Sequence, residues 1–459
     1  MTDSAAPEIL RVGRSPALRG VCTVPGDKSI SHRALLFGAL CRGPVEIRGL
    51  GLGGDNASTA AALRALGVPV HVSGSSALVD GRGFSGLCQA QSDLDCGNSG
   101  TTMRLFCGLL AGLPFETRLT GDPSLSRRPM GRVAKPLRLM GARIQGRTDD
   151  QRPEGILPPL VIAGGDLHGI DYALPVASAQ LKSALVLAGL QARGKTCIEE
   201  PGLSRDHTER MLRFLGAPIH ADPASRRVVV DPEGWNGELS ASAVAVPGDL
   251  SSAAFLLVAA AVVPGSDVTV EQVGLNPTRT GVLDALRAMA ANIDVIQTSE
   301  AMGEPVGRVR VRWAGPLQAA RIAGALALRS IDEIPALAVA CALAEGRSEF
   351  ADVGELRVKE SDRIGSITRE LARAGIEVQQ TSTGFYVQGT GGLSPKGGRV
   401  LPDRDHRIAM AGAVLGLLSD DETMVPSEDI ATSFPTFVEI LRALGANLKI
   451  DATPALGRV

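Results

Sequence analysis

Hydrophobic and polar positions along this chain repeat one pattern six times. In each copy an amphipathic stretch of helical period ends at a small residue, and alternating apolar residues typical of a strand follow. The helical ends are residues 63–67, 137–141, 212–216, 286–290, 371–375 and 441–445. The final residue is a glycine in five copies and Ala290 in the fourth. Glycine suits the left-handed conformation that closes a helix, so we expect the helices to end there.

The spacing of the copies indicates small α/β subdomains. The last residues of successive copies are 74, 75, 74, 85 and 70 positions apart, which is longer than the repeats of solenoid proteins. Each copy therefore has room for two helices and several strands. Three copies precede Val246 and three follow it, so the pattern predicts an α/β fold made of two three-copy halves.

The turn Val-Pro-Gly-Asp occurs at residues 24–27 and again at 246–249, near the joins of these halves, and each turn opens an apolar helix. A chain crossing between two lobes needs a hinge, and a cleft would open beside it. Only the first turn continues into Lys28, Ser29 and Arg33. The aspartate of the turn or Ser29 can cap the helix, and its N-terminal N–H groups attract an anion. A capped helix with solvated cations is the alternative.

Other polar residues gather at the starts of predicted helices. The segments are 97–101, 127–128, 178–180, 204–207, 331–335, 357–363 and 405–407. Each segment alone is typical of a helix cap or a solvated face. If several of these N-termini point to one cleft, their dipoles and the Arg and Lys side chains would form a positive pocket. Such a pocket suits small polyanions.

Composition narrows the range of partners. A net charge of −2 and 3% aromatic residues suggest neither an extended phosphate-binding face nor a set of base-stacking platforms, so we expect no nucleic-acid partner. The seven cysteines are scattered without a Cys-x-x-Cys pair, which is typical of reduced thiols. The chain begins without an apolar leader, and its longest apolar run, residues 253–263, is too short to span a bilayer. We expect a cytoplasmic monomer without membrane contact.

Three other kinds of chemistry have weaker support in the sequence. Residues 49–54 match G-x-G-x-x-G after a strand-like segment, which would indicate a nicotinamide-dependent oxidoreductase, but residues 68–79 then look like a hairpin instead of a parallel strand. Cys107 has the chemistry of a nucleophile, but its apolar neighbours favour a place in the core. The six histidines show no metal-ligand spacing, so no metal site is predicted.

Six ordered motifs resemble the 5-enolpyruvylshikimate-3-phosphate (EPSP) synthase family, from about residue 11 to residue 450. They are Pro-Gly-Asp-Lys-Ser-Ile-Ser-His-Arg at 25–33, Gly-Asn-Ser-Gly-Thr-Thr-Met-Arg at 97–104, Arg-Pro-Met-Gly at 128–131, Ser-Ala-Gln at 178–180, Arg-Val-Lys-Glu-Ser-Asp-Arg at 357–363 and Asp-His-Arg at 405–407. The resemblance implies a two-lobed inverse α/β barrel with three βαβαββ repeats in each lobe. The lobes would be residues 24–245 and residues 1–23 with 246–459, with the active site in the cleft between them.

The resemblance also implies an activity. Members of the family transfer the enolpyruvyl group of phosphoenolpyruvate to the 5-hydroxyl of shikimate 3-phosphate, a cofactor-free step of the shikimate pathway towards chorismate and aromatic amino acids. The implied phosphoenolpyruvate site is Lys28, Gly100, Arg128, Gln180, Arg363 and Arg407. The implied shikimate 3-phosphate site is Lys28, Ser29, Arg33, Ser178, Ala179, Gln180, Ser204, Arg205, Asp332 and Lys359. Asp332 would be the base on the 5-hydroxyl, and Glu360 with Lys28 would transfer protons at the methylene carbon.

Some positions depart from the common pattern of the family. Leu105 stands where many members have proline, and residues 431–433 lack a lysine found there in many members. The family is the target of glyphosate, and the Ser-Ala-Gln motif resembles that of tolerant members, whereas Gly100 does not. UDP-N-acetylglucosamine 1-carboxyvinyltransferase is the rival within the fold, but its loop cysteine is missing from residues 121–124. A binding protein for phosphorylated metabolites would need neither Asp332 nor Glu360.

Overall fold

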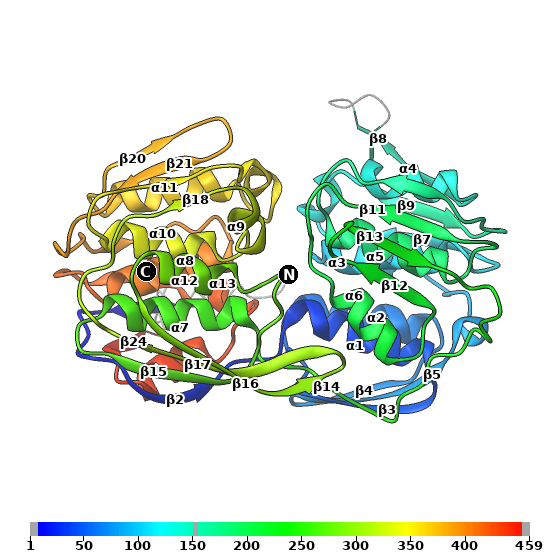
Figure 1. Cartoon of the computed structure of the whole chain (residues 1–459), viewed down its shortest axis with the longest axis horizontal. Helices are drawn as coiled ribbons and strands as arrows, with labels where there is room; N and C mark the ends of the chain where they lie inside the picture. The colour runs from blue at the N-terminus through cyan, green and yellow to red at the C-terminus, as the bar shows by residue number, and fades with distance from the viewer. Residues whose placement is uncertain (1–7, 150–154, 452–459) are drawn as a thin grey trace, which may run out of the picture. The chain divides into compact units, whose positions relative to one another are not determined.

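The computed structural model describes residues 8–149 and 155–451. The chain folds into two compact units. Unit 1 comprises Met1–Pro25, Gly248–Ser299 and Val306–Val459, and unit 2 comprises Gly26–Pro247 and Glu300–Pro305. The colour ramp of Figure 1 follows the chain through both units.

Six four-stranded sheets share one topology, in which an outer strand runs parallel to its neighbour and that neighbour runs antiparallel to the third strand. The sheets of unit 2 are β14(Ala243–Ala245)-β3(Arg42–Arg48)-β5(Ser76–Arg82)-β4(Val70–Ser73), β6(Leu94–Asp95)-β7(Glu116–Thr120)-β9(Ile156–Ala163)-β8(Arg143–Thr148) and β10(Asp171–Ala173)-β11(Thr196–Glu199)-β13(Arg227–Val230)-β12(Ile219–Asp222). The sheets of unit 1 are β2(Arg19–Thr23)-β15(Asp267–Gly274)-β17(Glu304–Arg312)-β16(Asn292–Ala301), β18(Arg321–Ile322)-β19(Arg347–Phe350)-β21(Phe385–Gln388)-β20(Val378–Gln380) and β22(Gly398–Arg399)-β23(Thr423–Pro426)-β1(Ile9–Val12)-β24(Leu448–Asp451). This sixfold repetition confirms the fold class.

Each repeat adds helices to its sheet. Those of unit 2 are α1(Lys28–Leu40), α2(Gly54–Ala65), α3(Gly100–Leu110), α4(Gly131–Leu139), α5(Ala179–Gly189) and α6(His207–Phe214), with the 3-10 turns η1(Phe84–Gly86) and η2(Leu125–Arg127). Those of unit 1 are α7(Leu250–Val262), α8(Gly281–Ala288), α9(Gly324–Arg329), α10(Ile334–Leu343), α11(Arg363–Arg373), α12(His406–Gly416), α13(Ser427–Ala431) and α14(Phe437–Ala443), with the 3-10 turn η3(Gly354–Val358). The order β6-α3-β7-α4-β8-β9 is a complete βαβαββ repeat.

The first helix of each repeat forms the core of its unit. Every residue of α7, α10 and α12 is buried, and α1, α3 and α5 are buried along almost their whole length. Helices that are apolar all round must lie inside a protein. In each unit these helices therefore fill the interior and the sheets cover them, which is the inverse barrel that the family resemblance implied (Figure 1).

The second helix of each repeat ends at the small residue that the sequence pattern predicts. Gly67, Gly141, Gly216, Gly375 and Gly445 have φ angles between 83° and 110°, and Ala290 has a φ of 65°. The left-handed conformation costs a residue with a Cβ roughly 1 kcal/mol, so glycine is preferred there. Ala290 adopts it because the position is set by the repeat and not by its own preference.

The structure also bears on the alternative interpretations of the glycine-rich segment 49–54 and of Cys107. The glycine-rich segment 49–54 joins β3 to α2, but the next strands, β4 and β5, form an antiparallel hairpin, so no parallel β-α-β unit follows. Cys107 is 1% exposed, and burial raises the pKa of its thiol to about 12. Within residues 8–149 and 155–451, no group of three or more His, Cys, Asp or Glu side chains could hold a metal ion. Of the helices in the described chain, none is long and apolar enough to cross a membrane.

Candidate active site

The first Val-Pro-Gly-Asp turn places Lys28 and Ser29 in the first turn of α1, in unit 2. A Cβ on Gly26 would lie 1.7 Å from the carbonyl oxygen of Gly49, so only glycine allows this close approach of two backbones. Asp27, and not Ser29, is the N-cap and accepts a hydrogen bond from the N–H of Ile30 at 2.9 Å. Lys28 is half-buried, and its Nζ lies 3.1 Å from Oδ2 of Asp55.

Arg33 lies one turn further along α1 and is buried. Its guanidinium donates from Nη1 to the carbonyl of Ser29 at 2.9 Å, from Nε to the Thr208 hydroxyl at 2.7 Å and from Nη2 to the Ser183 hydroxyl at 2.7 Å. Burial lowers the pKa of Arg33 to about 10, well above neutral pH. The side chain is therefore a fixed cation held by neutral acceptors from α1, α5 and α6.

A second cluster joins the N-termini of α3 and α5. Gly100 is the first residue of α3, and a Cβ there would lie 2.7 Å from Nη1 of Arg104. That same Nη1 donates to Oε1 of Gln180 at 2.7 Å, and Nε2 of Gln180 donates to the Thr101 hydroxyl at 2.9 Å. Arg128 donates from Nη2 to Oδ1 of Asn98 at 2.6 Å. Two predicted phosphoenolpyruvate residues are thus brought beside Gly100.

The remaining predicted residues of unit 2 lie at the starts of α5 and α6. Ser178 is the N-cap of α5 and accepts from the N–H of Leu181 at 3.4 Å, and Ala179 is the first residue of this helix. Ser204 and Arg205 lie in the segment that leads from β11 to α6. Ser204 is buried and donates its hydroxyl to the Glu200 carboxylate.

Unit 1 brings its five predicted residues together at the starts of α10, α11 and α12. Arg363, which is 1% exposed, lies with Nη1 3.2 Å from Oδ1 of Asp332 and with Nη2 2.7 Å from Oε2 of Glu360. Lys359 Nζ is 3.8 Å from the same Asp332 oxygen. Arg407 donates from Nη1 to the Asp332 carbonyl at 2.9 Å. Three cations therefore surround the predicted base.

Asp405 also belongs to this cluster. It is the N-cap of α12 and contacts both Arg407 and Arg363. Its Oδ1 accepts from the N–H of Arg407 at 3.0 Å as a helix cap, while its Oδ2 accepts from Nε of Arg363 at 2.7 Å. Burial alone would lower the pKa of Arg363, but the charges of Asp405, Glu360 and Asp332 outweigh it and raise that pKa. Burial alone would raise the pKa of Asp405, but Arg363 outweighs it and lowers that pKa.

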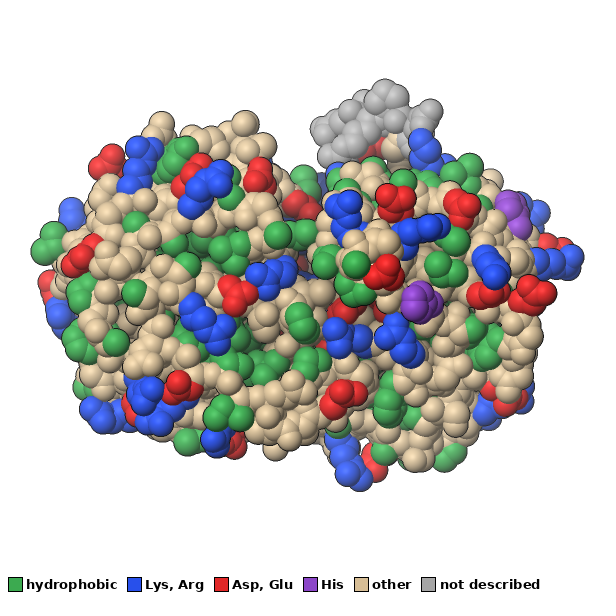
Figure 2. Space-filling model, in the orientation of Figure 1, with side chains coloured by type: hydrophobic (Ala, Val, Ile, Leu, Met, Phe, Trp, Pro, Cys, Tyr) green, Lys and Arg blue, Asp and Glu red, His purple; other side chains and the backbone are tan. Residues whose placement is uncertain are grey.

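The two groups of residues differ in charge. In the unit 1 cluster four carboxylates, those of Asp332, Glu355, Glu360 and Asp405, contact Lys359 or Arg363, so the charges of the cations are balanced and the helix N-termini supply the positive field. In unit 2, Arg33, Arg104 and Arg128 all donate to neutral acceptors. On the face of the described residues shown in Figure 2, blue and red side chains alternate over the surface.

Arg104 is the residue that the sequence analysis did not assign. It lies within the motif at 97–104, but a lone arginine in an apolar helix gives no reason to prefer a role in the site. The spacing of four residues from Gly100 was the available signal, because residues four apart share a helix face. Residues 431–433, which lack the family's lysine, lie at the end of α13.

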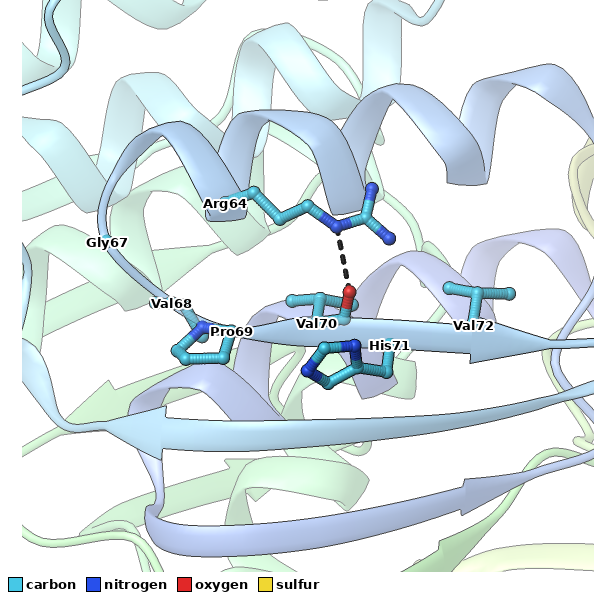
Figure 3. A pocket seen from close by; sticks show the side chains of 7 residues that line it. All are labelled: Arg64, Gly67, Val68, Pro69, Val70, His71 and Val72. Atoms are coloured by element: carbon cyan, nitrogen blue, oxygen red, sulfur yellow. Dashed lines mark hydrogen bonds between the residues drawn. The ribbon is translucent and has the colours of Figure 1, made fainter.

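A shallow pocket elsewhere in unit 2 carries no assignment. It lies where the end of α2 meets β4, and Arg64 spans it with Nε donating to the Val70 carbonyl at 2.8 Å (Figure 3). It is lined by Arg64, Gly67, Val68, Pro69, Val70, His71 and Val72. None of the candidate site residues lines it.

Comparison with known proteins identifies the family. The family model described as EPSP synthase (3-phosphoshikimate 1-carboxyvinyltransferase) matches residues 12–441. A protein of Halorhodospira halophila named 3-phosphoshikimate 1-carboxyvinyltransferase is 50% identical over 443 residues, which cover 96% of this chain and 97% of that protein. A protein of the same name from Geobacter sulfurreducens is 48% identical, with 93% of this chain and 96% of that protein covered.

Solved structures agree with these relatives. The structure of an EPSP synthase from Acinetobacter baumannii matches with a TM-score of 0.85 and 41% sequence identity. The match covers 97% of this chain and 100% of that one. Identity at this level over nearly the whole length, together with the six motifs and the sixfold repeat, shows that the chain belongs to the EPSP synthase family.

Proposed function

We propose that this chain transfers the enolpyruvyl group of phosphoenolpyruvate to the 5-hydroxyl of shikimate 3-phosphate, with the residues described above performing the chemistry. The observation that carries the proposal is the grouping of Asp332 and Glu360 with Lys359, Arg363 and Arg407 at three helix N-termini. Two carboxylates among fixed cations supply both requirements of the reaction, proton transfer and anion binding.

The reaction begins with proton transfer to the methylene carbon of phosphoenolpyruvate. The proton comes from Glu360 or Lys28, and C2 becomes electrophilic. The 5-hydroxyl oxygen attacks C2 while Asp332 takes its proton, which gives a tetrahedral intermediate. A proton then leaves the methyl carbon, the C2–O bond to phosphate breaks, and the enol ether and inorganic phosphate are released. One C–O bond forms and one breaks, so no oxidant or reductant is consumed.

The cations hold both substrates in attack geometry. We assign phosphoenolpyruvate to Lys28, Gly100, Arg128, Gln180, Arg363 and Arg407, and we add Arg104 because it fixes the orientation of Gln180. We assign shikimate 3-phosphate to Lys28, Ser29, Arg33, Ser178, Ala179, Gln180, Ser204, Arg205, Asp332 and Lys359. Preorganised donors of this kind stabilise developing charge without reorganisation. A cytoplasmic location, which the seven free cysteines favour, is part of the proposal.

Asp332→Asn tests the proposal. The amide can still accept from Arg363, so the fold and the binding of shikimate 3-phosphate should persist to within about tenfold, but the residue can no longer take a proton and kcat should fall about 10²- to 10⁴-fold. Phosphate release with both substrates is the measurement. Asp294→Asn is the control, because Asp294 is an exposed aspartate paired with Arg312.

Three results would contradict the assignment. Near-normal turnover of Asp332→Asn would remove Asp332 from the role of base. Absence of phosphate release by the wild-type protein with both substrates would reject the activity itself. Release with UDP-N-acetylglucosamine in place of shikimate 3-phosphate would reject the assigned acceptor.

A further inference from the structure

A buried lysine joins two buried glutamates in unit 2, beside the residues assigned to shikimate 3-phosphate. Lys182 Nζ lies 2.7 Å from Oε2 of Glu200 and 2.6 Å from Oε1 of Glu209. The side chains of all three are at most 2% exposed. Lys182 comes from α5, Glu209 from α6, and Glu200 directly follows β11. One ammonium group therefore ties three elements together inside the unit.

Stability alone does not explain such a cluster. Taking charges out of water is costly, and well-packed apolar residues often replace a buried ion pair without loss of stability. Burial alone would lower the pKa of Lys182, but the charges of Glu209 and Glu200 outweigh it and raise that pKa. The lysine is thus held as a cation, and its effect on the neighbouring chain is the feature that apolar residues could not supply.

Glu200 connects Lys182 to Ser204 through the two oxygens of its carboxylate. While Oε2 of Glu200 faces the lysine, its Oε1 accepts from the N–H of Ser204 at 3.3 Å and also from the Ser204 hydroxyl. Both polar groups of Ser204 are therefore fixed by one carboxylate oxygen, across a turn that contains Pro201 and Gly202. This turn leads directly to Arg205.

Glu209 has no such link to Ser204. Its Oε1 accepts from Lys182, and its buried Oε2 has no hydrogen-bond partner among the residues that the structure describes. Burial raises the pKa of Glu209, even though Lys182 opposes the shift. The two glutamates are therefore a matched pair: each is buried and each contacts the same ammonium group, but only Glu200 hydrogen-bonds to a residue assigned to the substrate, whereas Glu209 acts on Arg33 through its charge alone.

We infer that Lys182 and Glu200 are positioning residues for shikimate 3-phosphate, acting through Ser204. Lys182 fixes the Glu200 carboxylate relative to α5, whose N-terminus carries Ser178, Ala179 and Gln180, and Glu200 fixes Ser204 relative to that same helix. The two parts of the binding surface are thereby held at a constant spacing. The inference rests on the proposed function, because that function assigns Ser204 to the substrate.

Glu200→Gln and Glu209→Gln separate this role from a structural one. In Glu200→Gln the amide must turn its NH₂ group towards either Ser204 or Lys182, which are both donors, so one of the bonds is lost. In Glu209→Gln the NH₂ group can occupy the place of Oε2, and no hydrogen bond is lost. Each variant removes one negative charge from the same lysine, so electrostatic effects on the cluster are matched.

The measurements are the Kd of shikimate 3-phosphate by calorimetry, KM for each substrate and the melting temperature. Glu200→Gln should raise the Kd and KM for shikimate 3-phosphate about tenfold or more while KM for phosphoenolpyruvate changes less than about threefold. Glu209→Gln should leave all three within about twofold. If Glu200→Gln does not fold, Glu200→Asp replaces it, because it keeps the charge and withdraws the carboxylate from Ser204.

A double variant adds a test of the route through Ser204. Ser204→Ala should weaken shikimate 3-phosphate binding in the wild-type background and have a smaller effect in Glu200→Gln. Equal effects of Ser204→Ala in both backgrounds, or equal Kd values for the Glu200 and Glu209 variants, would overturn the inference while the proposed function stands. A wild-type protein without activity on shikimate 3-phosphate would instead overturn the proposed function.

Discussion

The two Val-Pro-Gly-Asp turns make the same helix start in two different settings. Asp27 caps α1 in unit 2 by accepting from the N–H of Ile30 at 2.9 Å, and Asp249 caps α7 in unit 1 by accepting from the N–H of Ser251 at 2.9 Å. The backbones are also equivalent, because the N–H of Asp27 donates to Pro247 and the N–H of Asp249 donates to Pro25. Identical local sequence has produced an aspartate cap in both places, although Asp27 accepts from the N–H three residues on and Asp249 from the N–H two residues on.

The side chains that follow the caps differ. Lys28 and Arg33 of α1 correspond to Leu250 and Phe255 of α7, which are both buried in the core. Asp249 is additionally held by Arg279, whose Nη2 lies 3.2 Å from it and 3.6 Å from Glu333. The second turn is thus paired with a buried cation from the segment between β15 and α8, whereas the first turn directs a half-buried lysine to the substrates in our proposal. The comparison teaches that the capped turn is a scaffold and that its function depends on the next six residues.

Removing the buried cation of the second copy should have the largest effect. Arg279→Met leaves Asp249 and Glu333 buried without their compensating charge, so the free energy of unfolding should fall by about 3–5 kcal/mol. Equilibrium urea denaturation measures this. Arg287→Met is the control, because Arg287 pairs with Asp284 at the surface and should cost less than about 1 kcal/mol. Equal stability of the two variants would show that the Arg279 cluster is not structural.

Lys28→Met should instead lower the activity and leave the free energy of unfolding almost unchanged. We expect kcat/KM for phosphoenolpyruvate to fall about 10²- to 10³-fold, because a preorganised cation is lost, while the free energy of unfolding changes by less than about 1 kcal/mol. Steady-state kinetics and urea denaturation check the two parts. Lys195→Met, at an exposed pair with Asp231, should change neither. A wild-type reaction rate in Lys28→Met would contradict the proposed difference in function between the two turns.

His32 gives α1 a pH dependence that α7 lacks at the corresponding residue, Ala254. Burial lowers the pKa of His32 to about 3; the charge of Asp55 opposes this shift, whereas the charge of Lys28 adds to it. In the unfolded chain His32 takes up a proton with its ordinary pKa of about 6.5, whereas in the folded chain it stays neutral at that pH. The free energy of unfolding therefore falls as the pH falls below about 6.5.

The expected loss from His32 between pH 7 and pH 5 is about 2 kcal/mol. In His32→Asn, which keeps a hydrogen-bonding group next to Thr59, urea denaturation should show this part of the pH dependence removed. His71→Asn, at an exposed position of β4, should retain the wild-type dependence. The same slope in His32→Asn and the wild type would mean that His32 is protonated in the folded state.

The helix ends of the first and fourth repeats permit the smallest test. Ala290→Gly should stabilise unit 1 by up to about 1 kcal/mol, because glycine adopts the φ of 65° without strain. Gly67→Ala should destabilise unit 2 by a similar amount, since Gly67 has a φ of 85° and a Cβ there makes only ordinary contacts with Cys88. Thermal denaturation compares both variants with the wild type. Shifts of the same sign would contradict the equivalence of the repeats.

The sequence by itself determined the repeating elements and their ends. The apolar periodicity, the small residue after each second helix and the aspartate caps depend on contacts between residues three or four apart, which local chemistry specifies. The family resemblance implied Asp332, Glu360 and Arg363 as site residues, and the structure brings these three together.

Only the tertiary structure decided how distant residues are paired. Arg104 with Gln180, Arg363 with Asp405, and Lys182 with Glu200 and Glu209 each join different helices or loops. In the sequence, Lys182 is one polar residue in an apolar stretch, and nothing in the local pattern identifies its partners. Its partners become available only when α5, α6 and the end of β11 pack together, because a buried charge is tolerated only where other chain segments supply the opposite charge.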